Sequence, residues 1–68
     1  MNEEVFNMEL RKFLKKVGVT SQREIEQAIR AAVERGKVSG TDTLQAKVVL
    51  TVEGVDLKTE ITGDIALS

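Results

Sequence analysis

Residues 44–67, LQAKVVLTVEGVDLKTEITGDIAL, form two runs in which apolar and polar side chains alternate. A period of two places successive side chains on opposite faces of a β-strand. One face of the first run carries Leu44, Ala46, Val48, Leu50 and Val52, and one face of the second carries Leu57, Thr59, Ile61, Gly63, Ile65 and Leu67. The pattern predicts a β-hairpin, with strands over about 43–53 and about 57–67, that has one largely apolar face.

The turn between the two strands has two possible positions within Glu53-Gly54-Val55-Asp56. A type II′ turn centred on Gly54-Val55 pairs Val52 with Leu57, whereas a type I′ turn centred on Glu53-Gly54 pairs Val52 with Val55. Both registers keep the apolar residues on one face, so the sequence leaves both open. We favour the first, because it extends the pairing further toward the C-terminus.

The chain before the hairpin changes to a helical period. Residues 37–43, KVSGTDT, are polar and turn-forming, which is typical of a loop. Upstream of them, apolar residues recur at spacings of three and four, as in an amphipathic helix. They form two stripes, Phe6, Leu10, Phe13, Leu14 and Val17 in the first and Ile25, Ala28, Ile29, Ala32 and Val33 in the second. We therefore expect two helices, over about 3–17 and about 21–35.

Capping residues stand at the ends of both expected helices. Asn2 is a favourable N-cap for the first, and Gly18 stands where a left-handed C′ glycine ends many helices. Ser21 and Glu24 form an S-x-x-E capping box for the second helix, and Gly36 closes it. The sequence thus predicts an α+β fold in the order α-α-β-β.

Length and composition restrict the chemistry. The 68-residue chain, a single domain over residues 1–68, has no Cys and no His, so we expect no metal and no cofactor. Ten basic residues nearly balance eleven acidic ones, which gives no global attraction to nucleic acid or anionic lipid. No apolar run approaches the roughly 18 residues of a membrane span, and the acidic N-terminus is unlike a signal peptide. We expect a cytoplasmic protein.

The expected hairpin leaves two strand edges open, and a two-stranded sheet is weak in isolation. A chain this short buries only about 60% of its unfolded surface, so it is marginally stable alone. Because disulfides and metals are missing, oligomerisation remains as the stabilising device. We predict a homodimer through the sheet edge, with the helix face as the alternative interface.

Residues 5–32, VFNMELRKFLKKVGVTSQREIEQAIRAA, resemble the N-terminal half of a small bacterial family known only as a domain of unknown function. The resemblance covers this half and the overall length. It implies a bacterial cytoplasmic protein, and it carries over no catalytic or binding residue.

Residues 17–22, VGVTSQ, are similar to the Leu-Gly-Val-Ser-Gln turn of bacterial DNA-binding helix-turn-helix proteins. This resemblance implies nucleic-acid binding through segment 13–35. The candidate contacts are Arg23, Gln27 and Arg30. The chain departs from the motif at Leu14, where a small residue is expected, and at Ile25, which comes one position late.

A second candidate surface is a basic patch on the first expected helix. It consists of Arg11, Lys12, Lys15 and Lys16. The patch suits an anionic partner, although bases near a helix C-terminus also favour the helix dipole. Met8 and Val5 lie off the apolar stripe and form a possible contact patch beside these stems.

The residue types leave little for catalysis. The chain has no His, Cys or Tyr, and Glu53 and Asp56 flank an exposed turn, where carboxylates keep ordinary properties. We expect no enzyme activity. The leading interpretation is a small bacterial homodimer that binds an unidentified protein or other macromolecule, and the alternative is the nucleic-acid interpretation above.

Overall fold

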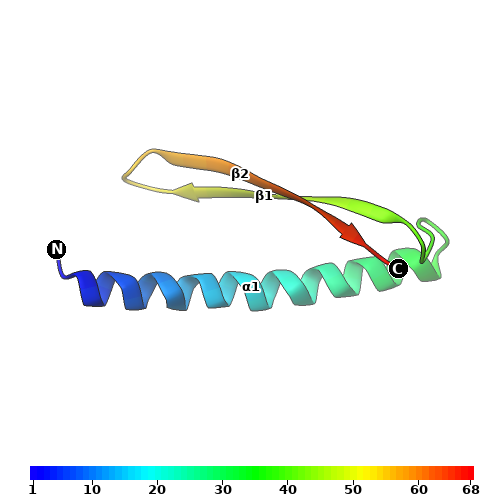
Figure 1. Ribbon diagram of the computed structural model, residues 1–68, viewed down its shortest axis with the longest axis horizontal. Helices are drawn as coiled ribbons and strands as arrows, with labels where there is room; N and C mark the ends of the chain where they lie inside the picture. Colours follow the sequence, from blue (N-terminus) through cyan, green and yellow to red (C-terminus); the bar gives the residue numbers. More distant parts are fainter. The chain divides into compact units, whose positions relative to one another are not determined.

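A computed structural model describes residues 1–68 as one α-helix followed by an antiparallel β-hairpin (Figure 1). The elements are α1 over Glu3–Glu34, β1 over Thr43–Val52 and β2 over Leu57–Ala66. The chain divides into two units, Met1–Lys37 with α1 and Val38–Ser68 with the hairpin. The predicted α+β class is confirmed, whereas the prediction of two helices is wrong.

α1 continues without a break through the segment where the sequence predicts a turn. Gly18 does not take the left-handed conformation that a C′ glycine needs, since only Gly36 and Gly54 among the glycines have positive φ. A glycine inside a helix costs about 1 kcal/mol relative to alanine. Nucleating a second helix costs more, because several residues must be ordered before the first hydrogen bond forms. Ser21 therefore lies inside α1 and caps nothing.

Both outer ends of α1 form as predicted. The Val5 N–H donates to Asn2 Oδ1 over 3.1 Å, which makes Asn2 the N-cap. At the other end Gly36 has φ of +74°, its N–H donates to the Val33 carbonyl over 3.1 Å, and the Lys37 N–H donates to the Ala32 carbonyl over 2.9 Å. These two bonds are the Schellman arrangement, which satisfies carbonyls that the last turn leaves free.

The continuous helix joins the two predicted apolar stripes. Its half-buried residues are Val17, Ser21, Ile25, Ile29, Ala31 and Ala32. The first four follow at spacings of four, slightly more than the 3.6 residues of one turn, so this row winds slowly around the axis. Phe6 and Phe13 continue the stripe toward the N-terminus and are 47% and 50% exposed. No residue of either unit is buried, so neither unit has a core of its own.

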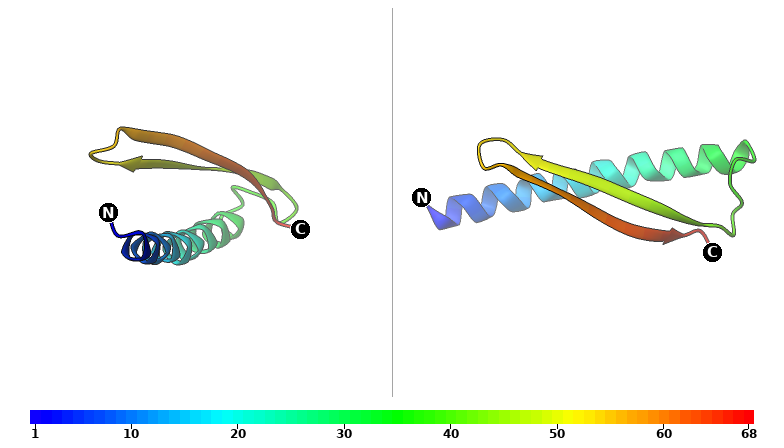
Figure 2. Two further views of the ribbon diagram at one scale, coloured as in Figure 1. Left: turned by 60° about the vertical axis from the view of Figure 1, so that its left-hand side comes forward. Right: turned by 90° about the horizontal axis from the view of Figure 1, so that it is seen from above.

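The hairpin has the first of the two predicted registers. Val52 pairs with Leu57 and Val48 with Ile61, and the ladder runs without a bulge to Thr43 and Ala66. The connecting loop spans residues 53–56, in which Gly54 has φ of +87° and Asp56 has φ of +54°. In a two-residue turn centred on Gly54-Val55, Glu53 and Asp56 would form the last pair of the ladder. Here the last pair is Val52 and Leu57, so the loop has two more residues, and one of them is the left-handed Asp56. The two strands twist about each other, as strand sterics favour (Figure 2).

A short turn leads into β1. The Asp42 N–H donates to the Ser39 carbonyl over 3.0 Å, and the Ser39 N–H donates to Asp42 Oδ2 over 2.8 Å. The Asp42 carbonyl then accepts from the Leu67 N–H over 3.0 Å. Through these hydrogen bonds, Asp42 connects the predicted loop, residues 37–43, to Leu67, which directly follows β2.

Candidate functional site

The two open edges of the hairpin are the first candidate site. Asp42 and Leu67 continue the register of the ladder and are joined by a hydrogen bond. Bonded and non-bonded pairs alternate along an antiparallel ladder, so even-numbered residues of β1 bond to β2. The backbone N–H and C=O groups that point outward from the β1 edge therefore belong to Thr43, Gln45, Lys47, Val49 and Thr51. By the same alternation, the outward groups of β2 belong to its even-numbered residues.

The two edges differ in charge. β1 carries one charged residue, Lys47, whereas β2 carries Lys58, Glu60 and Asp64. Lys47 Nζ lies 4.0 Å from Glu60 Oε1, and both side chains are 57% exposed, so this pair contributes little to stability. Charged residues on an edge strand discourage pairing with another chain. The β2 edge is thus protected, and the β1 edge is not.

The predicted apolar face of the hairpin is confirmed, because the pairing places its residues on one side of the sheet. Several of these residues remain exposed to solvent. Leu44, Ala46, Leu50 and Ile65 are half-buried. Val48 is 41% exposed, and Ile61, directly across from it, is 57% exposed. On the opposite face Val49 is 50% exposed among polar neighbours. A hairpin with this much exposed aliphatic surface needs a covering surface to be stable.

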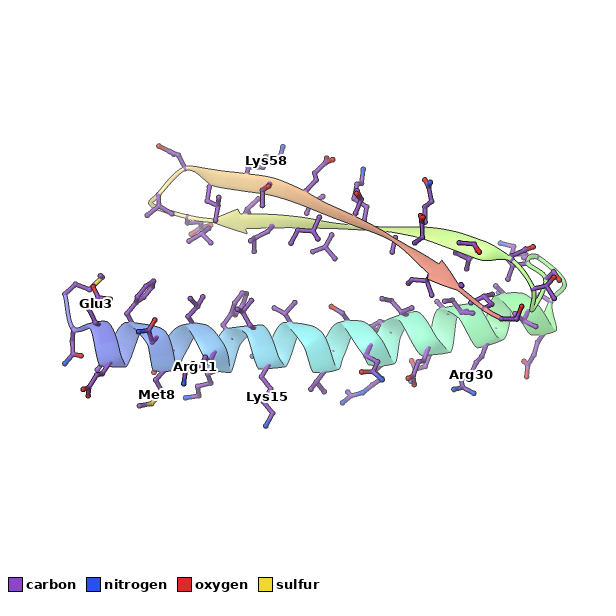
Figure 3. The ribbon with its side chains drawn as sticks, viewed as in Figure 1. Glu3, Met8, Arg11, Lys15, Arg30 and Lys58 are labelled. Atoms are coloured by element: carbon purple, nitrogen blue, oxygen red, sulfur yellow. The ribbon has the colours of Figure 1, made fainter.

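The basic patch lies on the first half of α1. Figure 3 shows Met8, Arg11 and Lys15 projecting from the same side of the helix, so Met8 lies among the basic stems. Met8 is 63% exposed, and Val5 and Val19 are 53% and 50% exposed. Arg11, Lys12, Lys15 and Lys16 all lie on α1, on the side away from its apolar stripe.

The continuous helix also aligns residues that the two-helix prediction kept apart. Lys12 and Arg30 are separated by eighteen residues, which is five full turns of 3.6. Lys16, Arg23 and Gln27 fall on this same side. The polar face of α1 therefore carries basic residues from Arg11 to Arg30, together with the carboxylates of Glu9, Glu26 and Glu34. Sequence reasoning missed this alignment, because it ended the first helix at Gly18.

The helix-turn-helix interpretation of segment 13–35 is wrong. The motif needs two helices joined by a turn at about 90–120°, and α1 has no turn between Glu3 and Glu34. Arg23, Gln27 and Arg30 remain exposed helix residues, but they do not belong to a separate recognition helix. Gln22 Nε2 donates to Glu26 Oε1 over 3.0 Å across the segment.

The family model described as Family of unknown function (DUF6494) matches residues 1–68. The chain belongs to DUF6494. The match confirms the resemblance to an uncharacterised family and extends it from residues 5–32 to the whole chain. No curated protein and no solved structure matches the chain.

Other features of this DUF6494 chain are weaker candidates. A hollow over the hairpin is lined by Gln45, Ala46, Lys47, Thr62, Gly63 and Asp64, and it is open to solvent. The structure brings together no group of three or more His, Cys, Asp or Glu side chains. No helix of the chain combines the length and the apolar content that crossing a membrane requires.

Proposed function

We propose that this chain is a homodimeric interaction protein that acts in the bacterial cytoplasm by binding another macromolecule, without catalysis. We further propose that the two copies meet at a sheet edge. The observation that carries the proposal is the hairpin itself, a sheet of two strands in which both strands are edges.

Neither unit is expected to be stable on its own. A two-stranded hairpin is marginally stable in water, and a single helix owes most of its stability to packing of its apolar face. Neither unit buries any residue, and the chain has no cysteine for a disulfide. A second copy supplies both missing elements, namely apolar cover and strand partners for the open edge.

Size-exclusion chromatography with light scattering at micromolar concentration tests the homodimer. We expect twice the 7.5 kDa mass of the chain. A mass of one chain at these concentrations would overturn the proposal. The control is the same measurement at high salt, because an interface built on strand pairing and apolar contact persists when surface charges are screened.

The second candidate function is binding of an anionic partner such as nucleic acid along the polar face of α1. The alignment of Lys12, Lys16, Arg23 and Arg30 on one side of a continuous helix favours it. Glu9, Glu26 and Glu34 on the same side oppose it, because carboxylates repel phosphates.

Fluorescence titration with generic duplex DNA and with single-stranded RNA at low salt tests this second function. If it holds, binding weakens as salt rises, and joint replacement of Lys12, Lys15 and Lys16 by Gln abolishes it. Joint replacement of Glu3, Glu4 and Glu9 by Gln is the matched control and should leave or improve binding. Absence of binding at tens of micromolar would remove this candidate.

A further inference from the structure

We propose that two copies of the chain join through their β1 strands, antiparallel and centred on Val48, into a four-stranded sheet ordered β2-β1-β1-β2. The inference rests on the homodimer proposed above and adds which edge is used and in which register. It is carried by the charge difference between the edges and by the sequence of β1.

The choice of edge follows from the charges. Pairing through β2 would place Lys58, Glu60 and Asp64 in the middle of the new sheet, whereas pairing through β1 places them on its outer edges. Outer edges that carry charged side chains resist further strand addition. Pairing through β1 therefore ends at two copies, and it puts the most β-branched and aliphatic strand at the centre, where such residues are most favourable.

Symmetry restricts the register. Two identical strands that pair antiparallel at the same edge are related by a two-fold axis perpendicular to the sheet. Residues with side chains on one face of a protomer then oppose residues of the same face in its partner. The apolar faces of the two hairpins thus become one continuous apolar surface.

Four centres allow at least seven residues of β1 to pair, namely Ala46, Lys47, Val48 and Val49, and they differ in which side chains oppose each other. A centre at Lys47 sets two lysines directly opposite each other, which is unfavourable. Centres at Ala46 and Val49 shorten the overlap to residues 43–49 and 46–52, whereas a centre at Val48 overlaps residues 44–52. The Val48 centre places Lys47 opposite the partner's Val49 and avoids the repulsion.

The side-chain sizes agree with this register. The small Ala46 lies opposite the partner's Leu50, and Leu44 lies opposite the partner's Val52. A large side chain against a small one fills a paired surface without a clash. On the other face, Gln45 lies opposite the partner's Thr51, which leaves no like charges opposed anywhere in the overlap.

Cysteine cross-linking tests the edge, because the chain has no native cysteine. Val48 bonds to β2, so Val48 and the partner's Val48 form a non-hydrogen-bonded pair with Cα atoms about 4.5 Å apart. This spacing lies within the range of about 4.4–6.8 Å that disulfides accept. Under oxidised glutathione, we expect most of the Val48→Cys variant to become a covalent dimer.

Ile61→Cys is the matched control. Ile61 pairs with Val48 across the hairpin, shares its face and is more exposed, 57% against 41%. We expect at least tenfold slower cross-linking at Ile61, because it lies on the opposite edge. Equal or faster cross-linking of Ile61→Cys would overturn the choice of β1.

A mixed-variant experiment tests the register. Leu44→Cys and Val52→Cys should each cross-link poorly alone and efficiently when the two variants are mixed and refolded together. A Lys47-centred or Val49-centred sheet would not oppose these two residues. Failure of the mixed pair, with Val48→Cys also failing to cross-link, would overturn the register.

Proline substitution gives a second readout that needs no cysteine. The Val49 N–H points outward from β1 and the Glu60 N–H outward from β2, so proline spares the ladder of the hairpin at both positions. We expect Val49→Pro to weaken dimerisation at least tenfold in light scattering, and Glu60→Pro to leave it unchanged. A dimer that tolerates Val49→Pro overturns the β1 edge and leaves the homodimer standing, whereas a wild-type monomer overturns both.

Discussion

Gly18 and Gly36 are the same residue type, and both were expected to end a helix, yet their backbone conformations differ. Gly36 has φ of +74° and closes α1, while Gly18 lies inside the helix without positive φ. A Cβ added at either position would meet nothing within 4 Å. Space therefore does not distinguish the two glycines, and the backbone conformation alone decides what a side chain would cost.

Replacement of each glycine by alanine should shift stability in opposite directions. Gly18→Ala should stabilise the protein by up to about 1 kcal/mol, because alanine is the better helix former. Gly36→Ala should destabilise it by about 1–2 kcal/mol, because a Cβ is strained in the left-handed region. Thermal unfolding followed by circular dichroism at 222 nm measures both. A destabilising Gly18→Ala would contradict a continuous α1 and would favour two helices.

At the scale of the element, α1 has one winding apolar row and one polar face. Ile25 lies in the half-buried row, and Val19, also aliphatic, is 50% exposed on the polar side. The hairpin is divided in the same way, with Val48 on its apolar face and Val49 on the polar one. Both elements thus have aliphatic residues on the apolar side and on the polar side. The residue type alone does not tell on which side a residue lies.

Truncation of these two helix residues should have unequal effects. Ile25→Ala removes part of the half-buried row and should cost about 1–2 kcal/mol. Val19→Ala should be neutral or slightly stabilising, because the lost surface was exposed and alanine has the higher helix propensity. Urea unfolding curves of the two variants give the comparison. Equal destabilisation by the two variants would mean that the apolar row of α1 is no more protected from solvent than its polar side.

At the scale of the whole molecule, the absence of any buried residue within either unit is the dominant property. A 68-residue chain has little core to build even when it folds well. Exposed aliphatic side chains on the helix and on the hairpin, together with two open edges, make association with another chain the expected source of stability.

The midpoint temperature of unfolding should therefore depend on protein concentration. Mass action stabilises a dimer by about 2.7 kcal/mol for a hundredfold rise in concentration, which raises the midpoint by several degrees. Differential scanning calorimetry from about ten micromolar to about one millimolar measures this shift. A midpoint that stays constant over the range would contradict an obligate dimer.

The sequence by itself determined the features that depend on neighbours a few residues apart. The Asn2 cap, the Gly36 terminus, the two strands and the preferred register Val52–Leu57 are all confirmed, because each depends on local backbone preferences or on a period of two. The family, too, was recognisable from residues 5–32.

Only the tertiary structure decided the features in which local signals compete or in which backbone direction matters. Gly18 and the Ser21 capping box favoured a break, and the cost of nucleating a second helix outweighed them. The break would have kept Lys12 and Arg30 on different helices, and the continuous α1 places them on one face. The outward-pointing groups of β1 likewise follow from the Leu67–Asp42 hydrogen bond, because alternation along a ladder is known only once one bonded pair is known.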